Sequence, residues 1–584
     1  MVNSRLDQIR AANDIKKIAP SDYAFLAEEI RSCLIEVISR TGGHLASNLG
    51  IVEVTMALHL CLTFPGDKLI FDVGHQSYVH KILTGRRIQF REIRTHGGIS
   101  GFPKRAESGS DAFGTGHSST ALSAALGFAA AREQLGQNYK IAVVAGDGAA
   151  TGGMFYEAFN NLACLKGNMV FVLNDNGMSI SPNVGAVAEW LKSSRKYSPA
   201  AFFDGINIDY RGPLDGHDLE VLVPAVKDAF ESSRPVLLHV LTKKGKGYGL
   251  AEKNPVWYHG LAGKAPGGGK GEETESYTDV FGKTITEMAG KDSRVTAVCA
   301  AMEHGVGLHG YRDAYPQRFY DVGIAEAHAV TFAAGLAAAG LKPYVAVYSS
   351  FLQRAFDQMI HDVCLQQLPV VFCMDRAGIV GEDGETHQGI FDLSYLTLMP
   401  GMTVAAPGDK DELREFLLWS LEFPSPLAIR YPKRRAYICP IAERDEIRLG
   451  KSEVLMQGRD IALLAVGSMV EDAVQIHDIL AQRGYWVSVV NVRFIKPFDR
   501  ELLFGLTCGH RLFVTMEENV WNGGYGQQVS AYLAGSGSNV HVLNIGIGDM
   551  FVKHGTIGGI KRELGLDKDM LAEKIIKEYR CCEK

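Results

Sequence analysis

Short runs of β-branched and other apolar residues alternate with longer stretches of helical periodicity along most of the chain. Residues 471–484, for example, carry apolar positions at the spacing of a helix that buries one face. This alternation predicts α/β domains built on parallel sheets, because parallel strands need crossover helices and are buried on both faces. The runs expected to form buried strands are 140–145, 169–173, 295–299, 344–348, 370–374, 461–466, 486–490 and 512–516.

Two stretches interrupt the pattern. Residues 263–276, GKAPGGGKGEETES, lack periodicity and are rich in Gly, Lys and Glu, which is typical of a flexible linker. A weaker break with prolines and mixed charges covers 433–459. The chain therefore divides into three segments, 1–262, 277–432 and 460–584. In doubly wound sheets ligands bind beyond the carboxyl ends of the strands, so the residues that follow each strand are the candidates for chemistry.

Composition and charge exclude several classes of protein. The net charge is −6, and the longest basic cluster, 433–435, is too short to track a nucleic-acid backbone. No apolar run of about 18 residues occurs, and the first ten residues are polar, so we expect neither a membrane span nor a signal peptide.

Cysteine and glycine usage add two expectations. The ten cysteines form no CxxC pair, which fits a reduced cytoplasm and argues against a structural zinc site. Gly outnumbers Pro by 64 to 20, which hints at loops whose backbone approaches a ligand.

Polar residues follow two of the predicted strands directly. Asp147 lies in Gly-Asp-Gly after 140–145, and Asn176 ends Asn-Asp-Asn after 169–173. A carboxylate and an amide oxygen beside small glycines suit Mg²⁺, which is held by oxygen ligands and phosphate. Gly-Asp-Gly alone is also common in ordinary turns, and it is the pair after two strands that indicates a metal–diphosphate site.

No phosphate-binding GxxxxGK[ST] loop and no GxGxxG at a strand–helix junction occurs. A metal–diphosphate site without them suggests thiamine diphosphate. That cofactor needs a carboxyl group that shares a proton with its aminopyrimidine, and an aromatic ring that packs on the pyrimidine. Glu326, which follows a strand-like run and opens a long apolar helix, fits the first requirement, although a helix N-terminus also favours Glu for its own sake. Phe351, just past 344–348, fits the second, although a core position is an equally simple interpretation.

Histidines recur in glycine-rich loops or at predicted strand ends. One such histidine is usually a loop residue with a local hydrogen bond. Several in one chain suggest a polar cavity for proton transfer and for recognition of phosphate or hydroxyl groups. They are His44, His75, His117, His259 and His387.

These residues lie in a set of strings that resembles the 1-deoxy-D-xylulose-5-phosphate synthase family, thiamine diphosphate enzymes related to transketolase. The strings span nearly the whole chain in the family's order, and transketolases proper lack most of them. They are GGHLASNLG (42–50), DVGHQSYVHKILTGRR (72–87), GHSST (116–120), GDG (146–148), LNDNGMSIS (173–181), DGHD (215–218), TKKGKGY (242–248), AEAHAVTFAAG (325–335), FLQRAFDQ (351–358), DRAGIVG (375–381), THQGIFDLSY (386–395) and IRYP (429–432).

The resemblance implies three parallel-sheet α/β domains with transketolase-like architecture. They would be a diphosphate-binding domain (1–265), a pyrimidine-binding domain (277–437) and a transketolase C-terminal-like domain (450–584). In the family the site forms between the first two domains of one chain, within a homodimer. The residues carried over as metal ligands are Asp147, Asn176 and Met178 through its carbonyl. Those expected around the cofactor are His75, Gly116, His117, Ser118, Asp147, Gly148, Ala149, Asn176, Lys244, Tyr248, Glu326 and Phe351.

The resemblance also implies the reaction, in which pyruvate loses CO₂ and condenses with D-glyceraldehyde 3-phosphate to give 1-deoxy-D-xylulose 5-phosphate for isoprenoid, thiamine and pyridoxal synthesis. Glu326, His44, His259 and His387 would be catalytic. Arg376 and Arg430 would hold the acceptor phosphate. The other residues expected at the substrate are Tyr348, Arg354, Asp383 and His387. The alternatives are a related enzyme with another donor or acceptor, and a paralogue that binds thiamine diphosphate without turnover.

Two positions depart from the family pattern. The segment between Ser181 and Asp209 is short, which removes much of an expected cover over the site and leaves gating and acceptor preference open. Ala327 stands where the family usually has Gln after the activating Glu, so one polar neighbour is lost.

Overall fold

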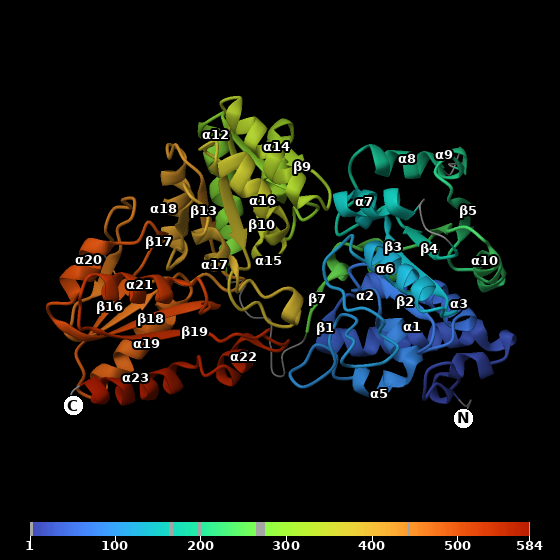
Figure 1. Ribbon diagram of the computed structural model, residues 1–584, viewed down its shortest axis with the longest axis horizontal. Coiled ribbons are helices and arrows are strands. Elements are labelled where there is room, and N and C mark those ends of the chain that lie inside the picture. Colours follow the sequence, from blue (N-terminus) through green and yellow to red (C-terminus); the bar gives the residue numbers. More distant parts are fainter. Residues whose placement is uncertain (1–3, 163–166, 195–199, 264–274, 442–443, 583–584) are drawn as a thin grey trace. The chain divides into compact units, whose positions relative to one another are not determined.

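The computed structural model describes residues 4–162, 167–194, 200–263, 275–441 and 444–582 (Figure 1). The chain forms two compact units, one of residues 1–270 with 323–325 and one of 271–322 with 326–584. Most of the predicted linker, 264–274, lies outside the described residues. No helix within the described ranges has the length and apolar character needed to cross a membrane.

The first unit is built on a five-stranded parallel sheet with strand order β2-β3-β4-β6-β5. Ile141 and Val143 face one hydrophobic cluster and Ala142 and Val144 face another, as the two-residue side-chain period of a strand requires. The strands are β2 (Lys68–Phe71), β3 (Ile141–Gly146), β4 (Val170–Asp175), β5 (Asp209–Asp215) and β6 (Val236–Leu241).

Helices cover both faces of this sheet. α6 and α7 pack into one cluster, and α3 and α10 pack into the other. A third cluster lies around α1, and a two-stranded antiparallel ribbon joins β1 (Gly42–Gly43) to β7 (Leu261–Ala262). The helices are α1 (Tyr23–Thr41), α2 (Leu45–Leu49), α3 (Val52–Cys61), α4 (Tyr78–Lys81), α5 (Arg87–Phe90), α6 (Ala121–Gln134), α7 (Gly153–Leu162), α8 (Ala186–Ser194), α9 (Ala200–Gly205), α10 (Leu219–Glu231) and α11 (Gly249–Lys253).

The second unit contains a seven-stranded sheet with order β17-β12-β13-β11-β10-β8-β9. All pairs are parallel except β17 on β12. The strands are β8 (Val295–Cys299), β9 (Phe319–Asp321), β10 (Lys342–Tyr348), β11 (Val371–Asp375), β12 (Thr403–Ala405), β13 (Leu427–Arg430) and β17 (Phe494–Lys496). Its helices are α12 (Tyr277–Lys291), α13 (His309–Ala314), α14 (Glu326–Ala338), α15 (Ser349–Leu352), α16 (Phe356–Gln358), α17 (Asp392–Thr397) and α18 (Lys410–Ser420).

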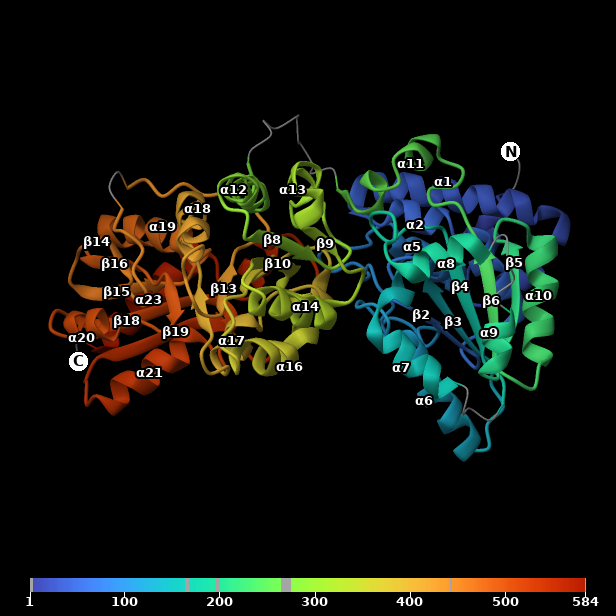
Figure 2. The same ribbon diagram turned by 90° about the horizontal axis from the view of Figure 1, so that it is seen from above.

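The same unit holds a five-stranded sheet with order β14-β16-β15-β18-β19, in which only β14 pairs antiparallel (Figure 2). One hydrophobic cluster includes residues of both sheets, among them Met374, Leu464 and Phe513. The strands are β14 (Glu453–Met456), β15 (Asp460–Ala465), β16 (Val487–Asn491), β18 (His510–Val520) and β19 (His541–Ile547). The helices are α19 (Met469–Gln482), α20 (Arg500–Leu506), α21 (Tyr525–Gly535), α22 (Ile557–Glu563) and α23 (Lys568–Cys582).

The prediction of an α/β fold on parallel sheets is confirmed. Every predicted strand is present, and 295–299 coincides with β8. β18 extends beyond the predicted 512–516 at both ends. Ten strands among the described residues were not among the predicted runs, because most of them are short. They are β1, β2, β5, β6, β7, β12, β13, β14, β17 and β19.

Candidate cofactor and substrate site

The expected metal ligands gather where the neighbouring strands β3 and β4 end. Asp147 follows β3, and the Gly177 N–H donates to its Oδ2 at 2.6 Å. Asn176 and Met178 belong to the same turn after β4, where the Met178 N–H donates to Asn176 Oδ1 at 3.1 Å. The structure therefore brings these three residues together.

Asp147 lies among buried charged groups. Burial and then the Asp175 carboxylate raise the pKa of Asp147 well above its ordinary value. The Lys244 ammonium donates to the Ser179 carbonyl, and burial lowers the pKa of Lys244 to about 8. A divalent cation bound at Asp147 would offset the repulsion between the Asp147 and Asp175 carboxylates.

Gly148 packs closely on the loop after β4. A Cβ on Gly148 would come within 2.8 Å of Ser179 Cβ, so a side chain there would push the two loops apart. The described residues contain no group of three His, Cys, Asp or Glu side chains placed to hold a metal. The expected set of one carboxylate, one amide and one carbonyl differs from such a group and fits Mg²⁺ bound together with a diphosphate.

Three of the predicted histidines form one cluster in the first unit. The ring centroids lie 5.3 Å apart for His44 and His75, 5.4 Å for His44 and His259, and 5.2 Å for His75 and His259. Tyr78 Oη lies 3.4 Å from His44 Nδ1, and Ser47 Oγ lies 3.4 Å from His259 Nδ1. Three imidazole rings from separate parts of the sequence thus lie in contact with one another.

The loop with Gly116, His117 and Ser118 precedes α6, and its neighbour Ser119 connects it to the metal-site loop. Ser119 Oγ donates to the Ala149 carbonyl at 2.9 Å. Tyr248, also expected at the cofactor, lies at the start of α11 and packs edge to face on Tyr258, next to His259, at 5.6 Å.

In the second unit Glu326 begins α14 and is 5% exposed. Burial raises the pKa of its carboxyl, and Arg354 opposes the shift from a distance of 3.9 Å between Nη1 and Oε2. A buried carboxyl with a raised pKa keeps its proton to a higher pH than an exposed one, which is the direction that the expected role requires.

Aromatic and cationic side chains lie beyond the ends of β10 and β11. Phe351 stacks on Tyr348 with centroids 5.5 Å apart and meets the His387 ring edge to face at 5.2 Å. The Arg376 guanidinium carbon lies 3.8 Å from the Tyr348 ring centroid. Asp383 comes just before the short 3₁₀ helix Gly384–Thr386 that leads to His387. These five predicted residues thus come from two strand ends and one loop.

Arg430, the last residue of β13, is placed differently from the other predicted substrate residues. Its side chain is 3% exposed, and its Nε donates to Asp392 Oδ2 at 2.9 Å.

Sequence reasoning missed two carboxylates that organise the site. Asp72, directly after β2, accepts from the N–H groups of Ser119 and Ala121 at 2.7 and 3.1 Å and so fixes the loop that holds His117. Asp392 likewise fixes the Arg430 side chain by accepting a hydrogen bond from its Nε. Asp72 directly follows a strand, which is the same signal that pointed to Asp147. Nothing in the sequence indicates that Asp392 pairs with Arg430, which lies 38 positions away.

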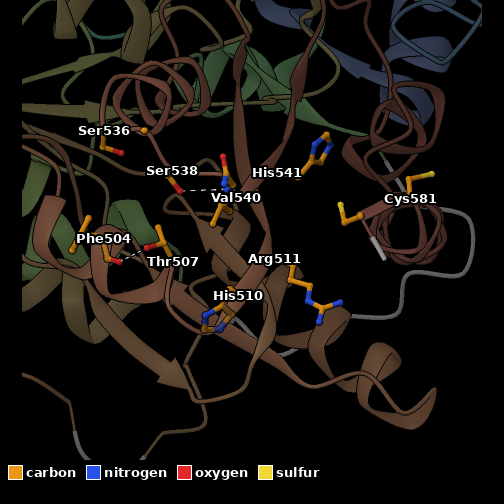
Figure 3. A pocket seen from close by; sticks show the side chains of 12 residues that line it. Phe504, Thr507, His510, Arg511, Ser536, Ser538, Val540, His541 and Cys581 are labelled. Carbon is orange, nitrogen blue, oxygen red and sulfur yellow. Dashed lines mark hydrogen bonds between the residues drawn. The ribbon is translucent and has the colours of Figure 1, made fainter. Parts of the chain in front are cut away.

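The shortened segment contains two short helices, α8 and α9, on either side of residues 195–199, which lie outside the described residues. Ala327 is in the first turn of α14. A cavity of about 620 Å³ in the second unit is lined by none of the predicted residues (Figure 3). It adjoins Arg511 and His541, at the amino ends of β18 and β19, which is the opposite edge from that expected for ligands.

Three family models match consecutive parts of the chain. The 1-deoxy-D-xylulose-5-phosphate synthase model matches residues 6–199 and 192–242, the pyrimidine binding domain of transketolase matches 273–437, and the transketolase C-terminal domain matches 450–571. The two parts of the first match meet inside the segment between Ser181 and Asp209, which agrees with a shortening there.

Curated relatives match the chain over its length. A 1-deoxy-D-xylulose-5-phosphate synthase of Lachnoclostridium phytofermentans is 50% identical over 616 aligned positions, covering 98% of this chain and 99% of the relative. One of Caldanaerobacter subterraneus subsp. tengcongensis is 46% identical with the same coverage. Among solved structures, a transketolase of Campylobacter jejuni is 17% identical, covers 96% of this chain and 100% of its own, and has a TM-score of 0.45. The identity to these relatives shows that the chain belongs to the 1-deoxy-D-xylulose-5-phosphate synthase family.

Proposed function

We propose that this protein condenses pyruvate with D-glyceraldehyde 3-phosphate, with loss of CO₂, to give 1-deoxy-D-xylulose 5-phosphate. It is a transketolase-type transferase that uses thiamine diphosphate and Mg²⁺, and its product serves isoprenoid, thiamine and pyridoxal synthesis. The observation that carries the proposal is the contact between the buried Asp147 carboxylate and the turn that contains Asn176, where the Gly177 N–H donates to Asp147. The chain in which this contact occurs belongs to the family named above.

Thiamine diphosphate, when bound, supplies the electron sink for decarboxylation and carbon–carbon bond formation. Asp147, Asn176 and the Met178 carbonyl would hold Mg²⁺, and Lys244 would face the diphosphate. Glu326 would keep a proton on its carboxyl for exchange with the pyrimidine ring, beside which Phe351 would pack. The remaining cofactor contacts would come from His75, Gly116, His117, Ser118, Gly148, Ala149 and Tyr248.

The chain's own side chains would position the two substrates. Arg376 and Arg430 would bind the phosphate of the acceptor through charge-assisted hydrogen bonds. His44, His259 and His387 would move protons at the substrate oxygens, which suits imidazole near neutral pH. The residues proposed to line the substrate position are Tyr348, Arg354 and Asp383.

We also propose the domain division 1–265, 277–437 and 450–584, a homodimer, and a cytoplasmic location. The two transketolase family models support the second and third domains, and the free cysteines among the described residues agree with a reducing compartment. Light scattering on the purified protein tests the dimer, and a single-chain mass would contradict it.

The reaction is tested by incubating the purified protein with thiamine diphosphate, Mg²⁺, pyruvate and D-glyceraldehyde 3-phosphate. We expect CO₂ release and formation of the deoxyketose phosphate, both lost when a chelator removes the metal. Other aldehydes and a ketose donor are compared in parallel, because the shortened 181–209 segment leaves acceptor preference open. A ketose replacing pyruvate would favour a transketolase activity, and binding of the cofactor without turnover would favour a non-catalytic paralogue.

A further inference from the structure

Arg430 and Asp392 form a buried ion pair in the second unit. Asp392 begins α17 and is fully buried, and Arg430 ends β13 at 3% exposure. Arg430 Nε donates to Asp392 Oδ2 at 2.9 Å. A buried arginine needs such a partner, because an unpaired charge in the interior is strongly unfavourable.

Asp392 is itself fixed on both carboxylate oxygens. Ser349 Oγ donates to Oδ2 at 3.1 Å, and the Leu393 N–H donates to Oδ1 at 2.8 Å. Ser349 comes directly after Tyr348, which is among the residues proposed for the substrate. The carboxylate is thus held between α17 and the end of β10. These two hydrogen bonds fix its orientation independently of the bond to the arginine.

One donor of the Arg430 guanidinium is not used in the pair with Asp392. Its Nη2 is buried and has no hydrogen-bond partner among the described residues. Among the described residues, the nearby Glu517 carboxylate makes no hydrogen bond to it, and its two oxygens accept from the Tyr525 and Gly526 N–H groups at 2.9 Å each. A buried charged donor without an acceptor is costly and is expected where a ligand supplies the acceptor.

We propose that Asp392 is a positioning residue for the phosphate of the acceptor substrate. It binds Arg430 through Nε alone, and so turns the guanidinium to present Nη2 to a phosphate monoester oxygen. This inference rests on the proposed function. It adds that selection of a phosphorylated aldehyde depends on a residue that does not itself contact the substrate.

The test is the ratio of kcat/KM for D-glyceraldehyde 3-phosphate to that for D-glyceraldehyde, measured on the holoenzyme. In Asp392→Asn, which keeps the shape and removes the charge, we expect this ratio to fall by about tenfold or more, the loss typical of a hydrogen bond to a charged group. The KM for pyruvate should stay within about twofold. Ser349→Ala, which removes one of the two donors to Asp392 Oδ2 and leaves the Arg430 bond in place, should lower the ratio in the same direction by a smaller factor.

Glu412→Gln is the matched control. Glu412 pairs with Arg493 at 2.6 Å, and both side chains are as buried as the Asp392–Arg430 pair. This variant should lower the melting temperature and leave the ratio unchanged. If Asp392→Asn does not fold, Ser349→Ala carries the test alone.

Equal losses on both aldehydes, or a parallel rise in the KM for pyruvate, would show that Asp392 is only structural and would overturn the inference. A wild-type protein that forms no product from the two substrates would instead overturn the proposed function.

Discussion

At the scale of single residues, three buried carboxylates have different surroundings. Asp147 lies beside a second carboxylate and a lysine, and we propose it as a metal ligand. Glu326 is buried, and burial raises the pKa of its carboxyl although Arg354 lies 3.9 Å away. Asp392 touches an arginine at hydrogen-bond distance and serves as its fixed partner. These surroundings agree with the three roles proposed above, a metal ligand, a proton carrier and a positioning group.

Glu326→Gln tests the proton carrier. The amide keeps the size of the side chain but cannot exchange the proton, so we expect kcat to fall by about 10²–10⁴-fold, the range for loss of general acid–base catalysis. Affinity for thiamine diphosphate, measured by calorimetry, should change little. Glu287→Gln, at an exposed pair with Arg414, is the control and should keep wild-type kcat. A normal rate in Glu326→Gln would contradict the assigned role.

At the scale of elements, strand ends in the second unit are held by side chains from other elements. Glu518 in β18 accepts from the Ile379 N–H at 3.2 Å, in the loop that follows Arg376. It also pairs with Arg434 and Lys561 at 2.8 and 3.0 Å. One carboxylate thus ties the loop after β11 to the five-stranded sheet.

Gly378→Ala tests this connection. A Cβ there would come within 2.3 Å of Glu518 Oε2, and the backbone has φ of +79°. We expect a loss of more than about 2 kcal/mol in unfolding free energy, with an increased KM for the phosphorylated aldehyde. Gly340→Ala is the matched control, since φ is +92° and nothing lies within 4 Å. It should cost only the backbone strain of about 1 kcal/mol and leave KM unchanged. Equal losses in both variants, in denaturant titrations, would contradict a role for the contact.

At the scale of the whole molecule, the two compact units differ in how many sheets share a core. The five-stranded sheet of the first unit lies between its own helices. In the second unit one hydrophobic cluster includes residues of both larger sheets, and β17 crosses from one to the other.

Two fragments test this difference. We expect residues 1–262 to fold alone, and residues 277–584 to unfold in a single cooperative transition in calorimetry. A fragment 277–449, which lacks β17 and half of the shared cluster, should bind a hydrophobic dye and show no sharp transition. A stable, cooperatively folded 277–449 would show that the two sheets are independent.

The sequence predicted what depends on local pattern and on strand-end position. Some buried parallel strands, such as β8, are continuous apolar runs and were predicted, as were residues directly after them, such as Asp147. Others, such as β2 and β6, are also buried and were not predicted. Partners joined only by folding were not visible. The Asp392–Arg430 pair and the pairing of β17 with β12 depend on contacts between distant segments, for which short strands and single residues carry no periodic signal.

The position of β17 limits how this chain can be recombined with its relatives. A crossover near residues 440–450 would take β17 from one parent and β12, which it pairs with, from the other. A crossover after Lys496 would instead divide the five-stranded sheet, leaving β14, β15 and β16 with one parent and β18 and β19 with the other. The second unit is therefore best inherited as one block, and chimeras should exchange it whole at the junction before α12.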